Sequence, residues 1–325
     1  MEWGFVIGEL GLVSRHCEPM LFGEAIPKTV REIASAEKLP RNDMKRLLLI
    51  CAFCALWLNK GRKDTPMNPT LETILNRKSM RAFEKRPVPA EVKAQILEAT
   101  LRAPTAGNMM LYSILDITDQ SIKDTLVKTC DNQPFIARAP LVWIFLADYQ
   151  RWYDYFDYSD VPAFCAQRDE EIRLPEEGDL FLACSDALIA AQNAVIAADA
   201  CGLGSVYIGD IIENYEIHQK LLNLPPHVFP IAMLVFGYPT QQQKDRTMTT
   251  RFDEKFIVFE NQYRRLDDDE LAEMFAERAK SMPQGKAMRD VANYGQYFYQ
   301  RKVGSDFSIE MSRSAKVMLE RWLKG

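Results

Sequence analysis

Two short clusters of basic residues stand out in a chain that is acidic overall. The first spans residues 77–81 and reads Arg-Lys-Ser-Met-Arg, and the second is the triplet Lys244, Asp245 and Arg246. A small phosphate requires neutralisation of its charge and several hydrogen-bond donors that converge on it. Guanidinium, ammonium and hydroxyl groups offer this chemistry, so the two clusters predict a site for a phosphorylated cofactor. A solvated loop is the alternative for the second cluster.

Two segments of small residues could let such a cofactor approach the backbone. Residues 103–108 read Ala-Pro-Thr-Ala-Gly-Asn and offer a hydroxyl and an amide beside a glycine. Gly209 follows an expected short strand, so its N–H can face a flat ligand with no side chain in between. Gly202 and Gly204 do not form a dinucleotide fingerprint, because they follow a helix and not a strand. Each motif taken alone is also compatible with an ordinary connection.

The composition limits the class of protein. The chain has 325 residues, is 47% hydrophobic and 26% charged, and carries a net charge of −5, as expected for a soluble protein with a sizeable core. This mild acidity argues against nucleic acid or an anionic membrane as the main partner. Seven cysteines in scattered, apolar surroundings predict a reducing, cytoplasmic location without a disulfide framework. The three histidines lack a ligand spacing, so no metal site is expected.

The chain divides into three parts. Residues 1–66 are expected to be an N-terminal extension, in which the apolar run 47–58 forms a short packed helix in preference to a membrane anchor. Cys51 and Cys54 within this run are interpreted as buried thiols. Residues 67–264 are expected to form the cofactor-binding domain. Residues 265–325 are expected to form a tail of two amphipathic helices that wrap a dimer, the first capped by the acidic run 267–270.

Helices and strands alternate within the central part. Apolar periodicity predicts helices, and continuous apolar runs predict buried strands. Helices are expected after a Thr70 cap and at 90–101, 122–129, 179–201 and 215–222, and strands at 111–118, 141–147, 206–208 and 231–236. The expected fold class is therefore α+β, a mostly antiparallel sheet flanked by helices. The helix at 179–201 is apolar nearly all round, so the domain or a second subunit must cover every side of it.

In their order along the chain, these motifs resemble those of the FMN-dependent nitroreductase family. The resemblance covers Met67 to about residue 264 and rests on 77–83, 87–89, 103–108, 132–133, 139–140, 202–209, 237–239 and 244–246. It implies a nitroreductase-like fold in an intertwined homodimer, with FMN bound non-covalently at the interface. It also implies an oxidoreductase that takes hydride from NADH or NADPH and reduces a small acceptor, such as a nitroaromatic or a quinone, by a ping-pong mechanism.

The resemblance also implies roles for individual residues. By similarity, the phosphate and ribityl chain would be held by Arg77, Ser79, Arg81, Lys244 and Arg246. Lys78 would reach the polar edge of the flavin, and Asn132 would lie near the same site. The partner subunit would supply Pro104, Thr105, Ala106 and Asn108, and the backbone at Ile208 and Gly209 would face the flavin N5 atom. No catalytic acid or base is implied, because the cofactor carries the chemistry.

One segment departs from the family pattern. Members often continue after the asparagine of the small-residue loop with Gln-Pro-Trp, whereas residues 109–112 here read Met-Met-Leu-Tyr. The substrate pocket is therefore expected to differ. Three alternatives stay open: a reductive dehalogenase-like or flavin-modifying enzyme on the same fold, a flavin-binding protein without turnover, and a domain without a cofactor. The sequence predicts neither the acceptor nor the choice between NADH and NADPH.

Overall fold

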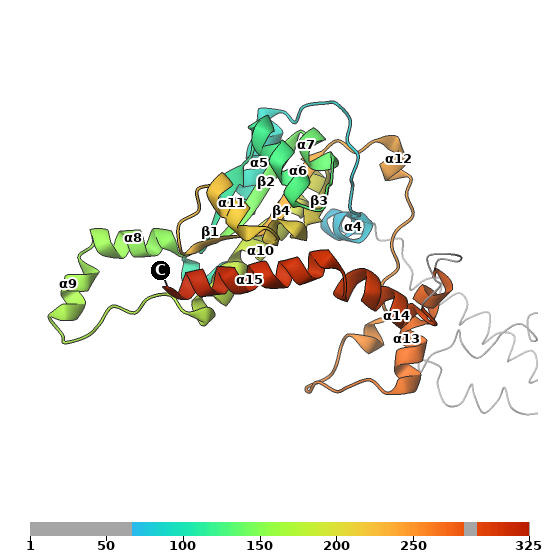
Figure 1. Ribbon diagram of the computed structural model, residues 1–325. Coiled ribbons are helices and arrows are strands. Elements are labelled where there is room, and N and C mark those ends of the chain that lie inside the picture. The colour runs from blue at the N-terminus through green and yellow to red at the C-terminus, as the bar shows by residue number, and fades with distance from the viewer. Residues whose placement is uncertain (1–66, 283–290, 325) are drawn as a thin grey trace, which may run out of the picture. The chain divides into compact units, whose positions relative to one another are not determined.

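The computed structural model describes residues 67–282 and 291–324 (Figure 1). The predictions made for residues 1–66, including the interpretation of Cys51 and Cys54, lie outside the described residues. Contacts within the chain group residues 68–325 into one unit, and it is this unit whose described part is considered below.

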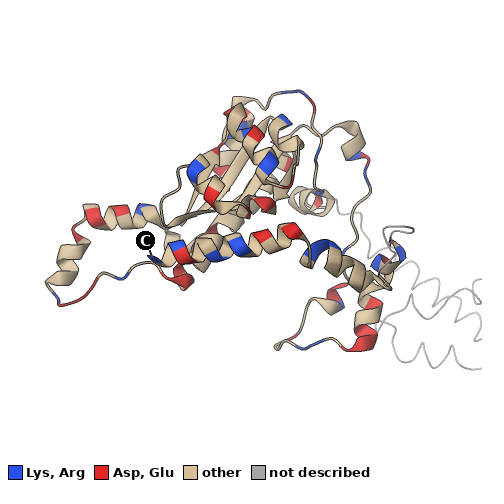
Figure 2. Cartoon of the chain, in the orientation of Figure 1, with Lys and Arg blue, Asp and Glu red and all other residues tan. Residues whose placement is uncertain are grey.

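A four-stranded antiparallel sheet forms the centre of this unit. Its strands are β1 (Tyr112–Asp116), β2 (Leu141–Asp148), β3 (Gly204–Ile208) and β4 (Val228–Gly237), in the order β1-β2-β4-β3. The two central strands β2 and β4 are nearly free of charged residues (Figure 2), and every residue of β2 is buried. Helices flank the sheet on both faces, which confirms the predicted α+β class.

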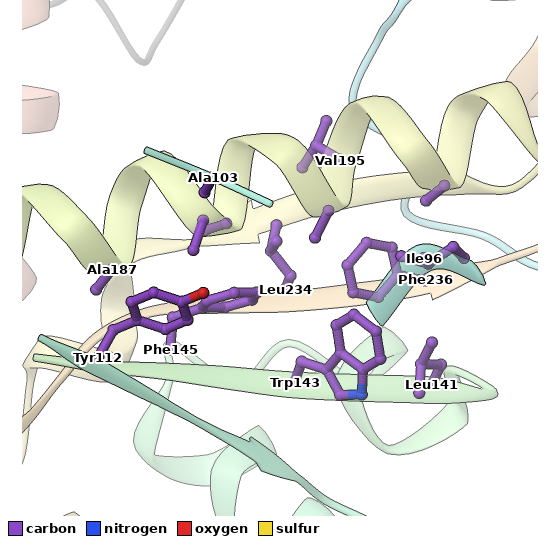
Figure 3. Close-up of a cluster of buried hydrophobic side chains, with 14 of the residues drawn as sticks. Ile96, Ala103, Tyr112, Leu141, Trp143, Phe145, Ala187, Val195, Leu234 and Phe236 are labelled. Carbon is purple, nitrogen blue, oxygen red and sulfur yellow. The ribbon is translucent and has the colours of Figure 1, made fainter. Parts of the chain in front are cut away.

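One face of the sheet is covered by the long helix α10 (Glu177–Ala200) and by α5 (Ala90–Leu101). The inner side of α10 consists largely of fully buried alanines. Because alanine is small, the helix can lie close to the strands, and the rings of Trp143 and Phe236 pack edge to face beneath it (Figure 3). The other face is covered by α6 (Gln120–Thr129), α7 (Phe135–Arg138) and α11 (Tyr215–Leu221).

The outer side of α10 is apolar and exposed. Phe181, Leu182, Leu188 and Ile189 are between 40% and 73% exposed. By length and hydropathy, α10 is also the one described helix that could cross a membrane. Its inner side is packed on the sheet, as in the core helix of a globular protein. The helix is therefore apolar on its inner and outer sides, as the sequence predicted.

The first described helix is capped differently from the prediction. Helix α4 runs from Pro69 to Asn76 and packs beside α10. The expectation that Thr70 caps it was wrong: the N-cap is Asn68, whose side chain accepts a hydrogen bond from the Thr70 N–H at 2.9 Å. The physical reason is that Pro69 occupies the first helical position, where its missing N–H costs nothing.

The C-terminal residues return to the sheet. Helix α13 (Asp268–Lys280) begins with the predicted acidic cap, in which Asp267 and Glu270 form a capping box. Helix α15 (Asp306–Lys324) packs on α11 and on the turn η3 (Gly209–Ile212), and it buries Trp322 completely. The last helix thus packs on its own chain, and the wrapping of a dimer by this tail stays a prediction. The shorter elements are α8 (Gln150–Tyr158), α9 (Val161–Ala166), α12 (Gln241–Lys244), α14 (Tyr294–Phe298) and a π-helical turn (Tyr299–Val303).

Candidate functional site

The first basic segment lies against the edge of the sheet. After α4 ends, Ser79 pairs with Ser205 of β3, and the Met80 N–H donates to the Ser205 carbonyl at 2.9 Å. The contact is close because β3 begins with Gly204: a Cβ there would lie 2.5 Å from the Met80 Cγ. The glycine therefore lets the segment 77–81 lie against β3. This contact determines the position of the basic side chains of the segment.

The second basic segment meets the first one in space. It follows β4 through the short helix α12. Lys78 Nζ donates to the backbone carbonyls of Lys244 and Arg246, and Arg246 Nη1 donates to the Ser79 carbonyl at 3.4 Å. Lys78 and Lys244 are 166 residues apart in the sequence. The structure thus brings together the two clusters that were predicted to share a site.

The cations of this cluster are available to a ligand. Across residues 67–282 and 291–324, no carboxylate lies within 4.0 Å of the charged groups of Arg77, Lys78, Arg81, Lys244 or Arg246. Such a set of unpaired cations beside a serine hydroxyl suits an anion with several oxygen acceptors.

Gln243 is a residue of this cluster that sequence reasoning missed. Its Oε1 atom accepts the Arg81 N–H at 3.0 Å and Arg246 Nη1 at 3.1 Å, so it joins the two basic segments. Three consecutive glutamines at 241–243 gave no sign of which one would turn inward.

The end of β3 offers an open backbone edge, four residues beyond the Ser205 that pairs with the first basic segment. Ile208 is buried and anchors the strand, whereas Gly209 is exposed and no atom lies within 4 Å of the position that a Cβ would take there. A flat ring could therefore approach the Gly209 backbone, as expected. Gln133 Nε2 donates to Asp210 Oδ2 at 2.8 Å, which brings the neighbouring Asn132 to the same end of the strand.

Two titratable groups near this edge are perturbed. Burial raises the pKa of Tyr207 to about 12, against the opposing charge of Arg77. Burial, followed by the charge of Asp210, raises the pKa of Glu213 to about 7. Tyr207 is partly exposed beside the cluster, whereas Tyr112, the other tyrosine considered for stacking, is a buried core residue.

The small-residue loop contacts α10 away from the cation cluster. The Ala106 N–H donates to Asp186 in the middle of this helix, whereas Arg77 acts electrostatically on Asp199 near its end. At about 1.5 Å per residue, these two positions are about 20 Å apart along the helix axis. Within one chain, the structure therefore does not bring the loop residues Pro104, Thr105, Ala106 and Asn108 to the cation cluster.

Asp186 is a second residue that sequence reasoning missed. It is the one acidic side chain between residues 180 and 198 of an otherwise apolar helix, and it is buried. A lone carboxylate on the inner face of such a helix was the signal that could have revealed it, because a buried charge requires hydrogen-bond partners.

The structure is thus an α+β protein in which a cluster of cations lies beside a strand that ends at an open backbone edge. The nitroreductase family model matches residues 74–238 of this chain. The oxygen-insensitive NADPH nitroreductase of Salmonella typhimurium is 32% identical over 222 residues, which cover 66% of this chain and 86% of that protein. The FMN reductase (NADPH) of Bacillus subtilis is 31% identical over 205 residues, which cover 62% and 78%. The solved structure of B. megaterium NfrA2 has a TM-score of 0.65 at 25% identity and covers 79% of this chain and 98% of its own.

The chain therefore belongs to the nitroreductase family, and the resemblance seen in its motifs is confirmed. The nitroreductase fold is confirmed as well. The matched region includes the first basic segment, the small-residue loop, Asn132 and the end of β3, but it stops before Lys244 and Arg246. The roles of those two residues stay predictions, and their contacts with the first segment are the evidence in their favour.

Proposed function

We propose that two copies of this chain hold FMN between them and reduce a small acceptor, such as a nitroaromatic or a quinone, with hydride from NADH or NADPH. Family membership makes the chain an FMN-dependent, NAD(P)H-dependent oxidoreductase of the nitroreductase type, as the sequence predicted. The acceptor, the ping-pong order, the homodimer and a cytoplasmic location are the parts that this proposal adds. The observation that carries it is the cluster of unpaired cations beside β3, the strand that ends at the open backbone of Gly209.

The residues present fit FMN. Its phosphate requires convergent cationic donors, which Arg77, Arg81, Lys244 and Arg246 offer together with the Ser79 hydroxyl. Its flat ring requires a backbone edge that no side chain blocks, and the space above Gly209 meets this requirement. Bound FMN supplies the chemistry of hydride transfer, while the protein supplies binding, orientation and electrostatics.

The chain's own groups act through charge and position. The cations neutralise the phosphate, and Lys78, which is held by two carbonyls, has one further N–H for the polar edge of the ring. The Gly209 N–H is a fixed donor at the strand end, where it can stabilise negative charge on a ring that faces it. None of these roles needs a proton to move on a side chain, which agrees with the prediction of no catalytic acid or base.

Two observations support a homodimer. The loop 104–108 and the cation cluster lie about 20 Å apart along α10, so a site built from both must take one of them from a second copy. The outer side of α10 is apolar, and the neighbouring helix α4 exposes Leu71, Ile74 and Leu75 beside it. A second copy that covers this surface would bury it and bring its loop to the flavin.

We also propose that the chemistry is confined to residues 67–264. In this proposal, residues 1–66 are an extension and residues 265–325 a helical tail that supports the fold.

The test is an absorbance spectrum of the purified protein, repeated after anaerobic addition of NADH or NADPH. Flavin bands that bleach support the proposal. Bands that persist with both nucleotides favour a flavin-binding protein without turnover. The absence of flavin bands after FMN is supplied refutes the proposal.

Arg81→Ala tests the cation cluster itself. Loss of one charged hydrogen bond, worth about 1.5–3 kcal/mol, should raise the dissociation constant of FMN about 10- to 100-fold. Because bound cofactor stabilises the folded state, the melting temperature at a fixed FMN concentration should fall as well. Lys85→Ala is the matched control, since Lys85 is an exposed cation of the same segment outside the cluster. Unchanged FMN affinity in the Arg81 variant would contradict the assignment.

A further inference from the structure

The loop that carries the small residues has an unusual backbone. Gly107, Asn108 and Met110 have φ angles of 55°, 58° and 51°, all in the left-handed region. Residues with side chains adopt this region seldom, and a chain that does so repeatedly cannot form regular backbone hydrogen bonds. Some of its groups bond within the loop, as the Met109 N–H does to the Ala106 carbonyl at 2.9 Å, and others find partners on neighbouring elements.

A single buried carboxylate holds both ends of the loop. Asp186 of α10 is 2% exposed, and its two oxygens accept the Ala106 N–H at 2.9 Å and the Leu111 N–H at 3.0 Å. Hydrogen bonds to an ionised acceptor are stronger than those between neutral groups. Because Ala106 and Leu111 bracket Gly107 and Asn108, the carboxylate determines how far these two residues project from the helix.

Donors on helix α8 hold the same loop from another side. Trp152 Nε1 donates to the Met109 carbonyl at 2.9 Å, and Arg151 Nη2 donates to the Met110 carbonyl at 2.6 Å. The segment that departs from the family pattern is thus fixed by this chain's own contacts. The Leu111 N–H bonds to α10, and the Met109 and Met110 carbonyls accept from α8.

The carboxylate has no ion-pair partner in the described part of the chain. A buried charge that only two N–H dipoles compensate is costly compared with an apolar residue of similar size. The helix around it is built from alanine and leucine, so packing alone gives no reason for an aspartate there. Its two hydrogen bonds to one loop are the reason that the structure offers.

We propose that Asp186 is a positioning residue of the flavin site. It fixes the loop 104–111 in the conformation in which Thr105, Ala106 and Asn108 contact the FMN bound by the second copy. This inference rests on the proposed function, because it requires the loop to be part of an FMN site.

Asp186→Asn tests the inference, with Asp179→Asn as the matched control. Asparagine keeps the shape but offers one acceptor and two donors, so one of the two loop N–H groups would face another donor. Asp179 also lies on α10, is 7% exposed and accepts the Glu176 N–H at 2.8 Å as well as two hydrogen bonds from Arg173, but it accepts none from the loop. Asp179→Asn should lower the melting temperature without changing FMN affinity.

The readouts are the dissociation constant of FMN, from quenching of its fluorescence below the melting range, and the visible circular dichroism of the bound flavin. Asp186→Asn should raise the dissociation constant about tenfold or more, which corresponds to one lost charged hydrogen bond, and should change the dichroism. Equal affinity in Asp186→Asn and wild type, or equal weakening in both variants, would overturn the inference. Wild-type protein that does not bind FMN would refute the proposed function instead.

Hydrogen exchange keeps the inference testable if Asp186→Asn does not fold. In the wild-type protein, the amides of Ala106 and Leu111 should exchange as slowly as those of β1, because both are bonded to a buried acceptor. Fast exchange of either amide would show that the carboxylate does not hold the loop.

Discussion

The ionisation of Glu213 should make the stability of this protein depend on pH. Glu213 ends the turn η3, which begins at Gly209, and it is 5% exposed. Its Oε1 atom has no hydrogen-bond partner in the described structure. Burial raises the pKa of this carboxyl from 4.5 to about 7, and the charges of Asp210, Asp131 and Glu310 act in the same direction. We therefore expect Glu213 to be protonated in the folded protein under mildly acidic conditions.

The sign and size of the effect follow from this pKa. A carboxyl whose pKa is raised by folding binds its proton more tightly in the folded chain, so its contribution to stability is fully present below the unfolded pKa of 4.5 and is lost as the pH rises through about 7. The whole difference corresponds to about 3 kcal/mol. Glu213→Gln keeps the shape and removes the charge. It should therefore raise the free energy of unfolding by about 2–3 kcal/mol more near pH 8 than near pH 5.

Thermal unfolding of both proteins across this pH range measures the effect. For a domain of this size, the expected difference corresponds to a gain in melting temperature of about 5–10 °C at the alkaline end. Glu216→Gln is the control with the opposite sign, because a hydrogen bond from Arg313 lowers the pKa of Glu216. This variant should be less stable than wild type at neutral pH and equal to it in acid. A Glu213→Gln effect that is the same at both ends of the range would refute the reasoning from burial.

Two further substitutions test the packing around the site. Gly204→Ala should cost about 1–3 kcal/mol in chemical denaturation and weaken FMN binding, because its Cβ would lie 2.5 Å from the Met80 Cγ and displace the first basic segment. Gly178→Ala, where no atom lies within 4 Å of the added Cβ, should do neither, and equal behaviour of the two variants would contradict the close contact. Trp322→Ala should cost about 3–5 kcal/mol, because the ring is fully buried against Phe229 and His227. An unchanged urea midpoint would mean that α15 does not pack on the sheet as described.

Local sequence patterns were sufficient to predict the elements that consist of long apolar runs. The seven apolar residues from Leu141 to Ala147 predicted the central strand β2, and the long apolar run predicted α10, because burial on both sides demands such runs. Gly202, read as a helix stop, has a φ of 77°. The segment 150–166 was missed, since its many aromatic residues follow no clear period, and it forms α8 and α9.

The site was predictable as a set of motifs but not as a geometry. The order of the motifs indicated that 77–81 and 244–246 act together, and these segments do lie side by side. The contacts of Lys78 with two backbone carbonyls could not be predicted, because they depend on the register of the first segment along β3. The position of the loop 104–108 against the middle of α10 likewise follows from the packing of that helix on the sheet.

The C-terminal helix shows how a segment without any site residue can still support the site. Helix α11 lacks a side-chain cap of its own, since Asn214 precedes it with a φ of 51°. Its first N–H groups are satisfied from α15: the Asn214 N–H donates to Glu310 at 3.0 Å, and the Tyr215 N–H donates to Ser314 at 3.2 Å.

These partners are 96 and 99 residues apart, so no local pattern could reveal them. Helix α11 directly follows η3. The start of η3 is held by the hydrogen bond from Gln133 to Asp210. The backbone that begins at Gly209 is therefore fixed from both sides, by the residue next to Asn132 and by the C-terminal helix. Because a preorganised backbone donor is effective only when it is held in place, we expect the tail to contribute to the proposed flavin site through the rigidity of this turn.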